Sequence, residues 1–224
     1  MIINIKRGDS FCSYDLDIQR NITVLELLHK IKEIDPTLSY RHMCRAGICG
    51  TCAVKVNGKN VLACKTRLDK FEDESIVLEP IDNAVVIKDL VVEHGCWFDK
   101  YKDIRVDFIP GKYDNFNFKS IENAKNCIAC FICNSVCPVM PIDKDFGGPF
   151  AFARVYGFLE DDRNQNKDYA KLMKGVLNHC THCKNCNYAC PLAVMPEVLI
   201  KKMEDKLISA GLLQAPQNDL FFGF

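Results

Sequence analysis

The residues of this chain best suited to chemistry are cysteines, which occur in two copies of one short pattern. Each copy reads C-x2-C-x2-C-x3-C-P, the first beginning at Cys127 and the second at Cys180. Three thiolates on one tight loop can each reach a different iron of a cubane cluster, whereas the fourth, before the proline, reaches the neighbouring cluster. The two copies therefore predict two cubane clusters with crossed ligand sets: Cys127, Cys130, Cys133 and Cys190 for one, and Cys137, Cys180, Cys183 and Cys186 for the other.

A third set of cysteines lies earlier in the chain and has a different spacing. It follows C-x4-C-x2-C from Cys44, and Cys64 completes it. This is the plant-type spacing of four thiolates around a [2Fe–2S] cluster. Glycines at 47 and 50 would let the backbone wrap closely and direct N–H groups at the sulfurs. We therefore predict one [2Fe–2S] cluster bound by Cys44, Cys49, Cys52 and Cys64.

The elements that must hold the first of these loops have the pattern of a small sheet with one helix. We expect strands over residues 2–6, 11–18 and 75–80. A capping box of Thr23 and Glu26 predicts a helix that ends before Asp35-Pro36. Asn57-Gly58 is a strong hairpin signal, and that hairpin would return Cys64 to the cluster loop.

After residue 84 the pattern becomes helical, and we place a domain boundary near Gly95. Helices are expected over residues 85–95, 149–162, 169–177 and 196–207, the last beginning at Pro196 and ended by Gly211. The predicted fold class is α+β. A plant-type [2Fe–2S] ferredoxin (β-grasp) domain over residues 1–95 precedes an α-helical, bacterial-ferredoxin-like domain with two cubane clusters over residues 96–224.

Composition restricts the class of protein. The 224 residues carry a net charge of zero and a pI near 6.9, without a basic stripe, which argues against a nucleic-acid partner. The first residues contain no apolar h-region, so the 14 cysteines favour metal over a disulfide framework. No apolar run approaches the ~18 residues that cross a bilayer. We expect any membrane contact to occur at the surface or through partner chains.

Several residues outside the ligand sets need an interpretation of their own. Cys12 and Cys96 are expected to be buried free thiols. His42 and His182 lie beside cluster cysteines but are not needed as ligands, since every site already has four thiolates; a proton relay at His182 is the alternative to a solvated histidine. The C-terminal FFGF is expected to be a docking surface or disordered.

The layout of the motifs resembles the iron–sulfur subunit of succinate dehydrogenases and fumarate reductases. The likeness includes the stretch Asp35–Arg41, the cysteine loop of residues 44–52, Asn57-Gly58, Leu62-Ala63-Cys64, residues 89–92, Gly148-Pro149 and residues 160–163. The resemblance implies that electrons pass along three clusters between an FAD-containing succinate/fumarate subunit and a quinone-reactive, membrane-associated subunit. It also implies that the chain has no catalytic residue or dicarboxylate site of its own. It implies a cytoplasmic location, peripheral on the inner face of the cell membrane, with export beside a partner as the alternative.

Two departures from the family pattern change what the resemblance implies. The family usually has an apolar residue in place of Cys183 and a [3Fe–4S] third cluster, so we expect a second [4Fe–4S] cluster here, with [3Fe–4S] as the alternative. Thr181 replaces the family's histidine, and residues 139–142 replace its tryptophan-containing stretch. These changes resemble the branch whose membrane-associated partner is cysteine-rich and heterodisulfide-reductase-like.

Two rival functions remain open at this point. One is the iron–sulfur subunit of another oxidoreductase, such as a thiol-dependent fumarate reductase or a glycolate-oxidase-like complex. The other is a zinc-bearing interaction module, since sets of four cysteines also suit tetrahedral zinc. Zinc does no redox chemistry and does not need the crossed repeat.

Overall fold

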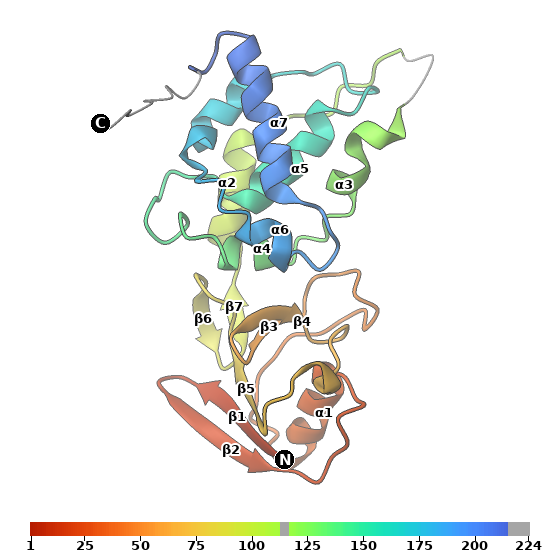
Figure 1. Cartoon of the computed structure of the whole chain (residues 1–224), viewed down its shortest axis with the longest axis vertical. Coiled ribbons are helices and arrows are strands. Elements are labelled where there is room, and N and C mark those ends of the chain that lie inside the picture. Colours follow the sequence, from red (N-terminus) through yellow and green to blue (C-terminus); the bar gives the residue numbers. More distant parts are fainter. Residues whose placement is uncertain (113–116, 215–224) are drawn as a thin grey trace, which may run out of the picture.

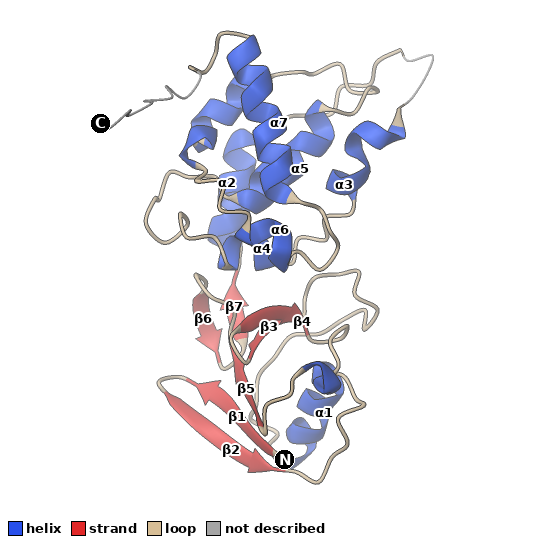
Figure 2. Cartoon of the chain, in the orientation of Figure 1, coloured by secondary structure: helices blue, strands red, loops and turns tan. Residues whose placement is uncertain are grey.

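The computed structural model describes residues 1–112 and 117–214, which form an elongated molecule with two differently built halves. The strands gather at the end that holds the N-terminus, and most helices lie at the other end (Figure 1). Helix α1 (Val24–Ile34) packs within the strand-rich half (Figure 2). The predicted α+β organisation is confirmed.

A mixed sheet of five strands forms the N-terminal half, in the order β2-β1-β5-β3-β4. The strands are β1 Ile2–Arg7, β2 Ser10–Asp15, β3 Ala53–Val56, β4 Lys59–Leu62 and β5 Ser75–Glu79. β1 and β5 run parallel, and the other neighbours run antiparallel. Ile3 and Ile76 are paired across β1 and β5 and fully buried, on the face of the sheet that α1 covers.

Helix α1 begins and ends where the sequence predicts. Thr23 Oγ1 accepts a hydrogen bond from Glu26 N at 3.2 Å, and Thr23 N donates to Glu26 Oε2 at 2.6 Å, so the capping box is present. The apolar face of the helix, with Leu27, Leu28 and Ile31, is buried in the same core as β1 and β5. The segment after Ile34 is then free to wrap into the cysteine loop before β3.

The helix predicted over residues 85–95 is wrong. The chain forms an antiparallel hairpin there, β6 (Val85–Lys88) and β7 (Val91–Glu93). Valine and isoleucine favour strands because of their branched Cβ. Asp89, in the turn between the strands, is 6% exposed and bonded to Arg7 Nε at 3.0 Å and to Ser39 N at 2.8 Å. Those bonds fix the turn against the sheet domain, and the helix begins only afterwards.

The C-terminal half is built from helices around α5 (Pro149–Leu159). The others are α2 (Gly95–Ile104), α3 (Glu122–Lys125), α4 (Ile132–Ser135), α6 (Asn185–Ala189) and α7 (Pro196–Ser209). Both α2 and α7 pack against α5, most of whose side chains are buried. Pro196 is the first residue of α7 and Gly211 follows its end with φ +71°, as the sequence predicts.

Two helices differ in extent from the sequence prediction. α5 ends at Leu159, three residues before the expected end, because Asp161 and Arg163 bond to each other in the next turn. Residues 169–175 form a 3₁₀ segment rather than an α-helix, and a second 3₁₀ turn follows over residues 177–179. Gly175 packs closely there: a Cβ at this position would lie 2.9 Å from Ile104 Cγ2. In the described part of the chain, no helix has both the length and the apolar character needed to cross a membrane.

Candidate metal centres

The first candidate site is the loop from Cys44 to Cys52 together with Cys64. Gly47 and Gly50 both have positive φ, +72° and +73°, which lets the backbone curl around the sulfurs. Ala46 N lies 3.4 Å from Cys44 Sγ, and Cys64 N lies 3.4 Å from Cys52 Sγ. The hydrogen bond from Ala46, with others from the same loop, lowers the pKa of Cys44 to about 6. The thiolate, the form that binds iron, is therefore favoured at Cys44, whereas burial raises the pKa of Cys52 to about 12.

The second candidate site is a cavity in the helical half. It is lined by one thiol set and by apolar side chains such as Phe131, Phe150 and Leu192; the cysteines are Cys127, Cys130, Cys133 and Cys190. Burial raises the pKa of Cys130 to about 12 and raises that of Cys133 well above its ordinary value. Val194 N lies 3.4 Å from Cys190 Sγ. Four converging sulfurs in an apolar cavity need a bound cation to be stable as thiolates, so the donor set fits an iron cluster.

The third candidate site is a neighbouring cavity lined by the remaining four cysteines of the helical half, Cys137, Cys180, Cys183 and Cys186. Burial raises the pKa of Cys186 to about 12 and that of Cys180 to about 11, while peptide N–H groups of Glu197 and His182 oppose those shifts. Cys183 is exposed. The structure thus gathers the cysteines into the two crossed sets that the spacing predicts. That these sets bind iron stays a prediction.

The two cysteine runs have the same backbone fold, including positive φ at equivalent positions. Ala129 and Phe131 of the first run have positive φ, and so do His182 and Lys184 at the same places in the second. Each run also has an asparagine after its third cysteine. Asn134 Oδ1 accepts from Phe150 N at 2.9 Å, and Asn187 Oδ1 accepts from Glu197 N at 2.8 Å.

These asparagines do what a capping side chain does, although they come from a distant part of the chain. Phe150 and Glu197 each follow the proline that begins α5 or α7, and neither helix has a capping side chain of its own. The cysteine spacing did not predict this role of the asparagines. The repeated Cys-Asn at 133–134 and 186–187 was the available signal.

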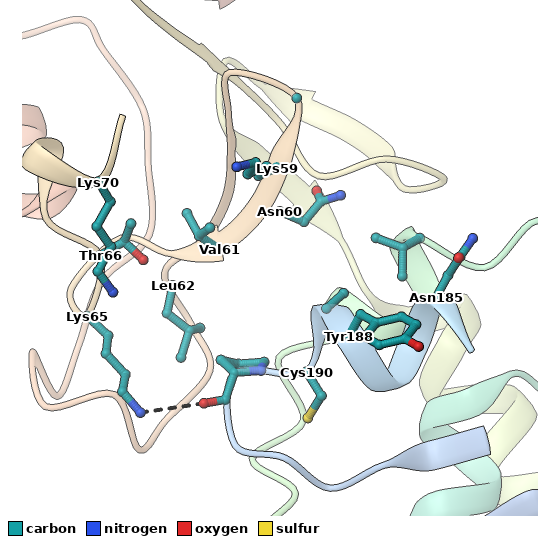
Figure 3. Close-up of a pocket in the computed structure, with 14 residues that line it drawn as sticks. Lys59, Asn60, Val61, Leu62, Lys65, Thr66, Lys70, Asn185, Tyr188 and Cys190 are labelled. Atoms are coloured by element: carbon teal, nitrogen blue, oxygen red, sulfur yellow. Dashed lines mark hydrogen bonds between the residues drawn. The ribbon is translucent and has the colours of Figure 1, made fainter. Parts of the chain in front are cut away.

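The first and second candidate sites touch each other through Gly50. A Cβ on Gly50 would lie 2.6 Å from Ile128 O and 2.9 Å from Cys130 N. Nearby, Lys65 Nζ lies 3.5 Å from the carbonyl of Pro191. Figure 3 shows this contact at a groove of about 630 Å³ between the β3–β4 hairpin and α6, with Cys190 on its wall. The two halves therefore meet where their cysteine loops lie.

The second and third sites are also adjacent, because the two runs exchange their last cysteines. Cys133 is close enough to Cys186 for the charges of their thiolates to interact. The short helices α4 and α6, which follow the two cysteine loops, pack against each other. The order in space is thus first, second, third site, from the sheet domain into the helical domain.

The remaining candidate residues lie where they have structural partners. The ring of His42 meets that of His29 edge-on and lies tilted against that of Tyr40. His182 lies between two buried carboxylates, at 3.0 Å from Glu197 Oε1 and 2.9 Å from Glu204 Oε2. Cys12 is half-buried, whereas Cys96 is exposed, so the expectation of a buried Cys96 is wrong. Cys96 lies in the first turn of α2, where only its neighbour Trp97 points into the core. The FFGF sequence lies outside the described residues.

Comparison with known proteins finds one family model in each half of the chain. Residues 4–99 match the model of a 2Fe-2S iron-sulfur cluster binding domain, and residues 123–194 match that of a 4Fe-4S dicluster domain. In structure the chain is similar to one in the Mycobacterium smegmatis Sdh1 complex in the apo form. The TM-score is 0.84 at 24% identity, over 95% of this chain and 97% of that one.

In sequence, the chain is similar to curated proteins over most of its length. One is the fumarate reductase iron-sulfur subunit of Mycobacterium tuberculosis, 32% identical over 88% of this chain and 86% of the relative. Another is the mitochondrial succinate dehydrogenase [ubiquinone] iron-sulfur subunit 3 of Arabidopsis thaliana, 30% identical over 85% of this chain and 67% of the relative. The chain belongs to the family of iron–sulfur subunits of succinate dehydrogenases and fumarate reductases.

Proposed function

We propose that the three sets of cysteines hold one [2Fe–2S] and two [4Fe–4S] clusters, and that the chain relays electrons between a flavoprotein subunit and a quinone-reactive subunit. When bound, the clusters supply one-electron carriers. The chain's own residues place the three sites in contact and in order. The observation that carries the proposal is the gathering of the cysteines of the helical domain around two cavities in crossed sets.

The order of the sites assigns a partner to each end of the molecule. The first site lies in the sheet domain, beside the exposed side chains of Met43 and Ile48, 68% and 69% exposed. We assign that end to the FAD-containing subunit that interconverts succinate and fumarate. The third site, with the exposed Cys183, faces the quinone-reactive, membrane-associated subunit. Neither end needs a dicarboxylate site in this chain.

The finer assignments concern the third site and its partner. Cys183 lines the third cavity with the other three thiols, which supports a cubane rather than a [3Fe–4S] cluster. Thr181 and residues 139–142, at the places of the family's quinone-side residues, support a cysteine-rich, heterodisulfide-reductase-like partner. We propose that the assembled complex lies at the inner face of the cell membrane.

The decisive experiment is anaerobic purification of the native complex through a tag on this chain. Mass spectrometry should identify a flavoprotein and a cysteine-rich membrane-associated subunit, and the complex should reduce fumarate or oxidise succinate. The chain purified alone should contain the clusters but convert neither substrate. Co-purification with an unrelated oxidoreductase, or succinate turnover by the flavin-free chain, would contradict the proposal.

A further inference from the structure

The loop that carries Cys183 is tied to α7 by one side chain, His182. Its Nδ1 lies 3.0 Å from Glu197 Oε1, and its Nε2 lies 2.9 Å from Glu204 Oε2. Glu197 is in the first turn of α7 and Glu204 is two turns later. The imidazole ring lies between the two side chains and contacts both. Both glutamates are 6% exposed. The imidazole is therefore held at both nitrogens by carboxylates that little water reaches.

The matching loop of the first run is held in another way. Its residue at the place of His182 is Ala129, whose methyl group packs against the core but can form no hydrogen bond to a helix. Instead Phe131, at the place of Lys184, is 1% exposed and packs against Trp97 and Phe150. Burial of this aromatic ring fixes the backbone beside Cys130, itself only 9% exposed.

The second run lacks that apolar anchor among the described residues of its loop. Cys183 and Lys184 are both exposed, and the backbone of His182 has φ +52°, a conformation that is strained for a residue with a side chain. An exposed, strained loop would release its cysteine readily. His182 opposes this through two buried carboxylates, by a hydrogen bond to Glu197 and an ion-pair contact with Glu204.

We propose that His182, bridged between Glu197 and Glu204, is a positioning residue that keeps Cys183 at the fourth corner of the third cluster. It thereby decides whether that site stays a cubane or loses one iron. This inference rests on the proposed function, in which Cys183 is an iron ligand. The role of His182 is mechanical: it holds the backbone of the adjacent residue and binds no iron itself.

The test compares three substitutions in the anaerobically purified complex. His182→Ala removes the bridge, and Glu204→Ala removes one of its two supports. Asp205→Ala is the matched control, because it removes the next carboxylate of α7, which is exposed and bonded to Lys201 at 3.1 Å rather than to His182. The readouts are the EPR spectrum of the oxidised complex, the iron content, and alkylation of Cys183 by iodoacetamide, located by mass spectrometry.

We expect the wild type and Asp205→Ala to show no oxidised [3Fe–4S] signal and to leave Cys183 unmodified. His182→Ala should show that signal, should lose up to about one iron per chain, and should be alkylated at Cys183, since one corner of a cubane holds one iron. Glu204→Ala should show the same changes to a smaller extent. A Cys183→Ile variant supplies the reference EPR spectrum of a third site that has lost the Cys183 ligand and the iron bound to it.

Three results would overturn the inference. In one, His182→Ala keeps the cubane and a protected Cys183. In another, it loses the whole third cluster, which would show general structural support rather than a hold on one corner. In the third, the wild type already carries the oxidised signal; then Cys183 is not a ligand, and the cluster assignment fails before the role of His182 does.

Discussion

At the scale of single residues, Cys183 differs from the other cysteines that line the second and third sites because it is exposed, while Cys137 and Cys186 are buried. The iron at the Cys183 corner of a cubane could be lost without exposing the hydrophobic core. Three cysteines remain, of which Cys137 and Cys186 are buried and Cys180 is half-buried, and three thiolates are what a [3Fe–4S] cluster requires.

We therefore predict that Cys183→Ile converts the third cluster to [3Fe–4S] without unfolding the domain. Its reduction potential should rise, because one thiolate charge is removed and reduction is opposed less. EPR of the oxidised protein and a redox titration measure both effects. Cys186→Ser is the contrasting variant and should lose the whole third cluster, since Cys186 is only 5% exposed. An unchanged iron content in Cys183→Ile would refute the assignment of Cys183 as a ligand.

A second prediction at this scale concerns His94, whose ring stacks on Phe131 and Trp97 and whose Nε2 is buried without a partner among the described residues. Burial lowers the pKa of His94, and Arg41 lowers it further, while Glu93 opposes both. The unfolded chain, with a histidine pKa near about 6.5, binds a proton there that the folded chain does not. The contribution of His94 to the free energy of unfolding should therefore be complete above about pH 6.5 and should be lost as the pH falls below that value.

The variant His94→Phe keeps an aromatic ring in the stack and cannot titrate. Urea denaturation under anaerobic conditions, between about pH 5.5 and 8, gives the free energy of unfolding at each pH. This free energy should change less with pH in the variant than in the wild type. The slopes should differ by at most about 1.4 kcal/mol per pH unit. Equal slopes in the two proteins would show that His94 does not contribute.

At the scale of elements, each cysteine run is joined to the helix behind it by an asparagine. Asn187 accepts from Glu197 N at 2.8 Å and donates to Glu197 Oε2 at 3.0 Å, so one side chain links α6, α7 and the third cysteine loop. Asn83 does a related job between domains, because its Nδ2 lies 2.8 Å from Ser135 O at the end of α4. Short helices of four or five residues depend on such contacts, since they have few internal hydrogen bonds.

We predict that Asn187→Ala destabilises the helical domain by about 1–3 kcal/mol, because it leaves buried groups of Glu197 without their partner. Denaturation of the anaerobic protein in urea measures the change. Asn185→Ala is the control: it lies on the same helix and is exposed, so we expect it to have little effect. If both variants lose the same stability, capping by Asn187 is not the cause.

At the scale of the whole molecule, two domains with separate cores are joined through their cysteine loops. Cys130 and Ile132 of the helical domain belong to the hydrophobic cluster of the sheet domain, so the second loop is part of both structures. The ion pairs of Arg7 with Asp35 and Asp89 hold the chain on either side of the first loop. The contact at Gly50 sets how closely the first and second sites approach.

We predict that Gly50→Ala moves the first and second sites apart, because its Cβ would overlap Ile128 O. The magnetic interaction between the reduced clusters, visible by EPR, should weaken, and electron transfer through the chain should slow. Gly58→Ala is the matched control, since Gly58 also has positive φ, +78°, but its added Cβ would meet no atom within 4 Å. It has the same backbone strain without the collision. An identical loss in both variants would show that strain alone is responsible.

The sequence by itself determined the chemistry of this chain, because ligand spacing is a local property. The patterns C-x2-C-x2-C-x3-C-P and C-x4-C-x2-C predict the iron donors, the crossed sets and the order of the cluster domains without any knowledge of distant contacts. The capping box at Thr23 and the start of α7 at Pro196 were predictable for the same reason. Each depends on residues within one or two turns.

Only the tertiary structure decided the contacts between segments far apart in the chain. Residues 85–95 have an apolar pattern compatible with either helix or strand, and the buried bond between Arg7 and Asp89, 82 residues apart, goes with the hairpin. The same holds for Gly50 against Ile128 and for His182 between Glu197 and Glu204. Burial and partner geometry determine whether such residues are spacers, anchors or solvated side chains, and neither can be obtained from the spacing of residue types.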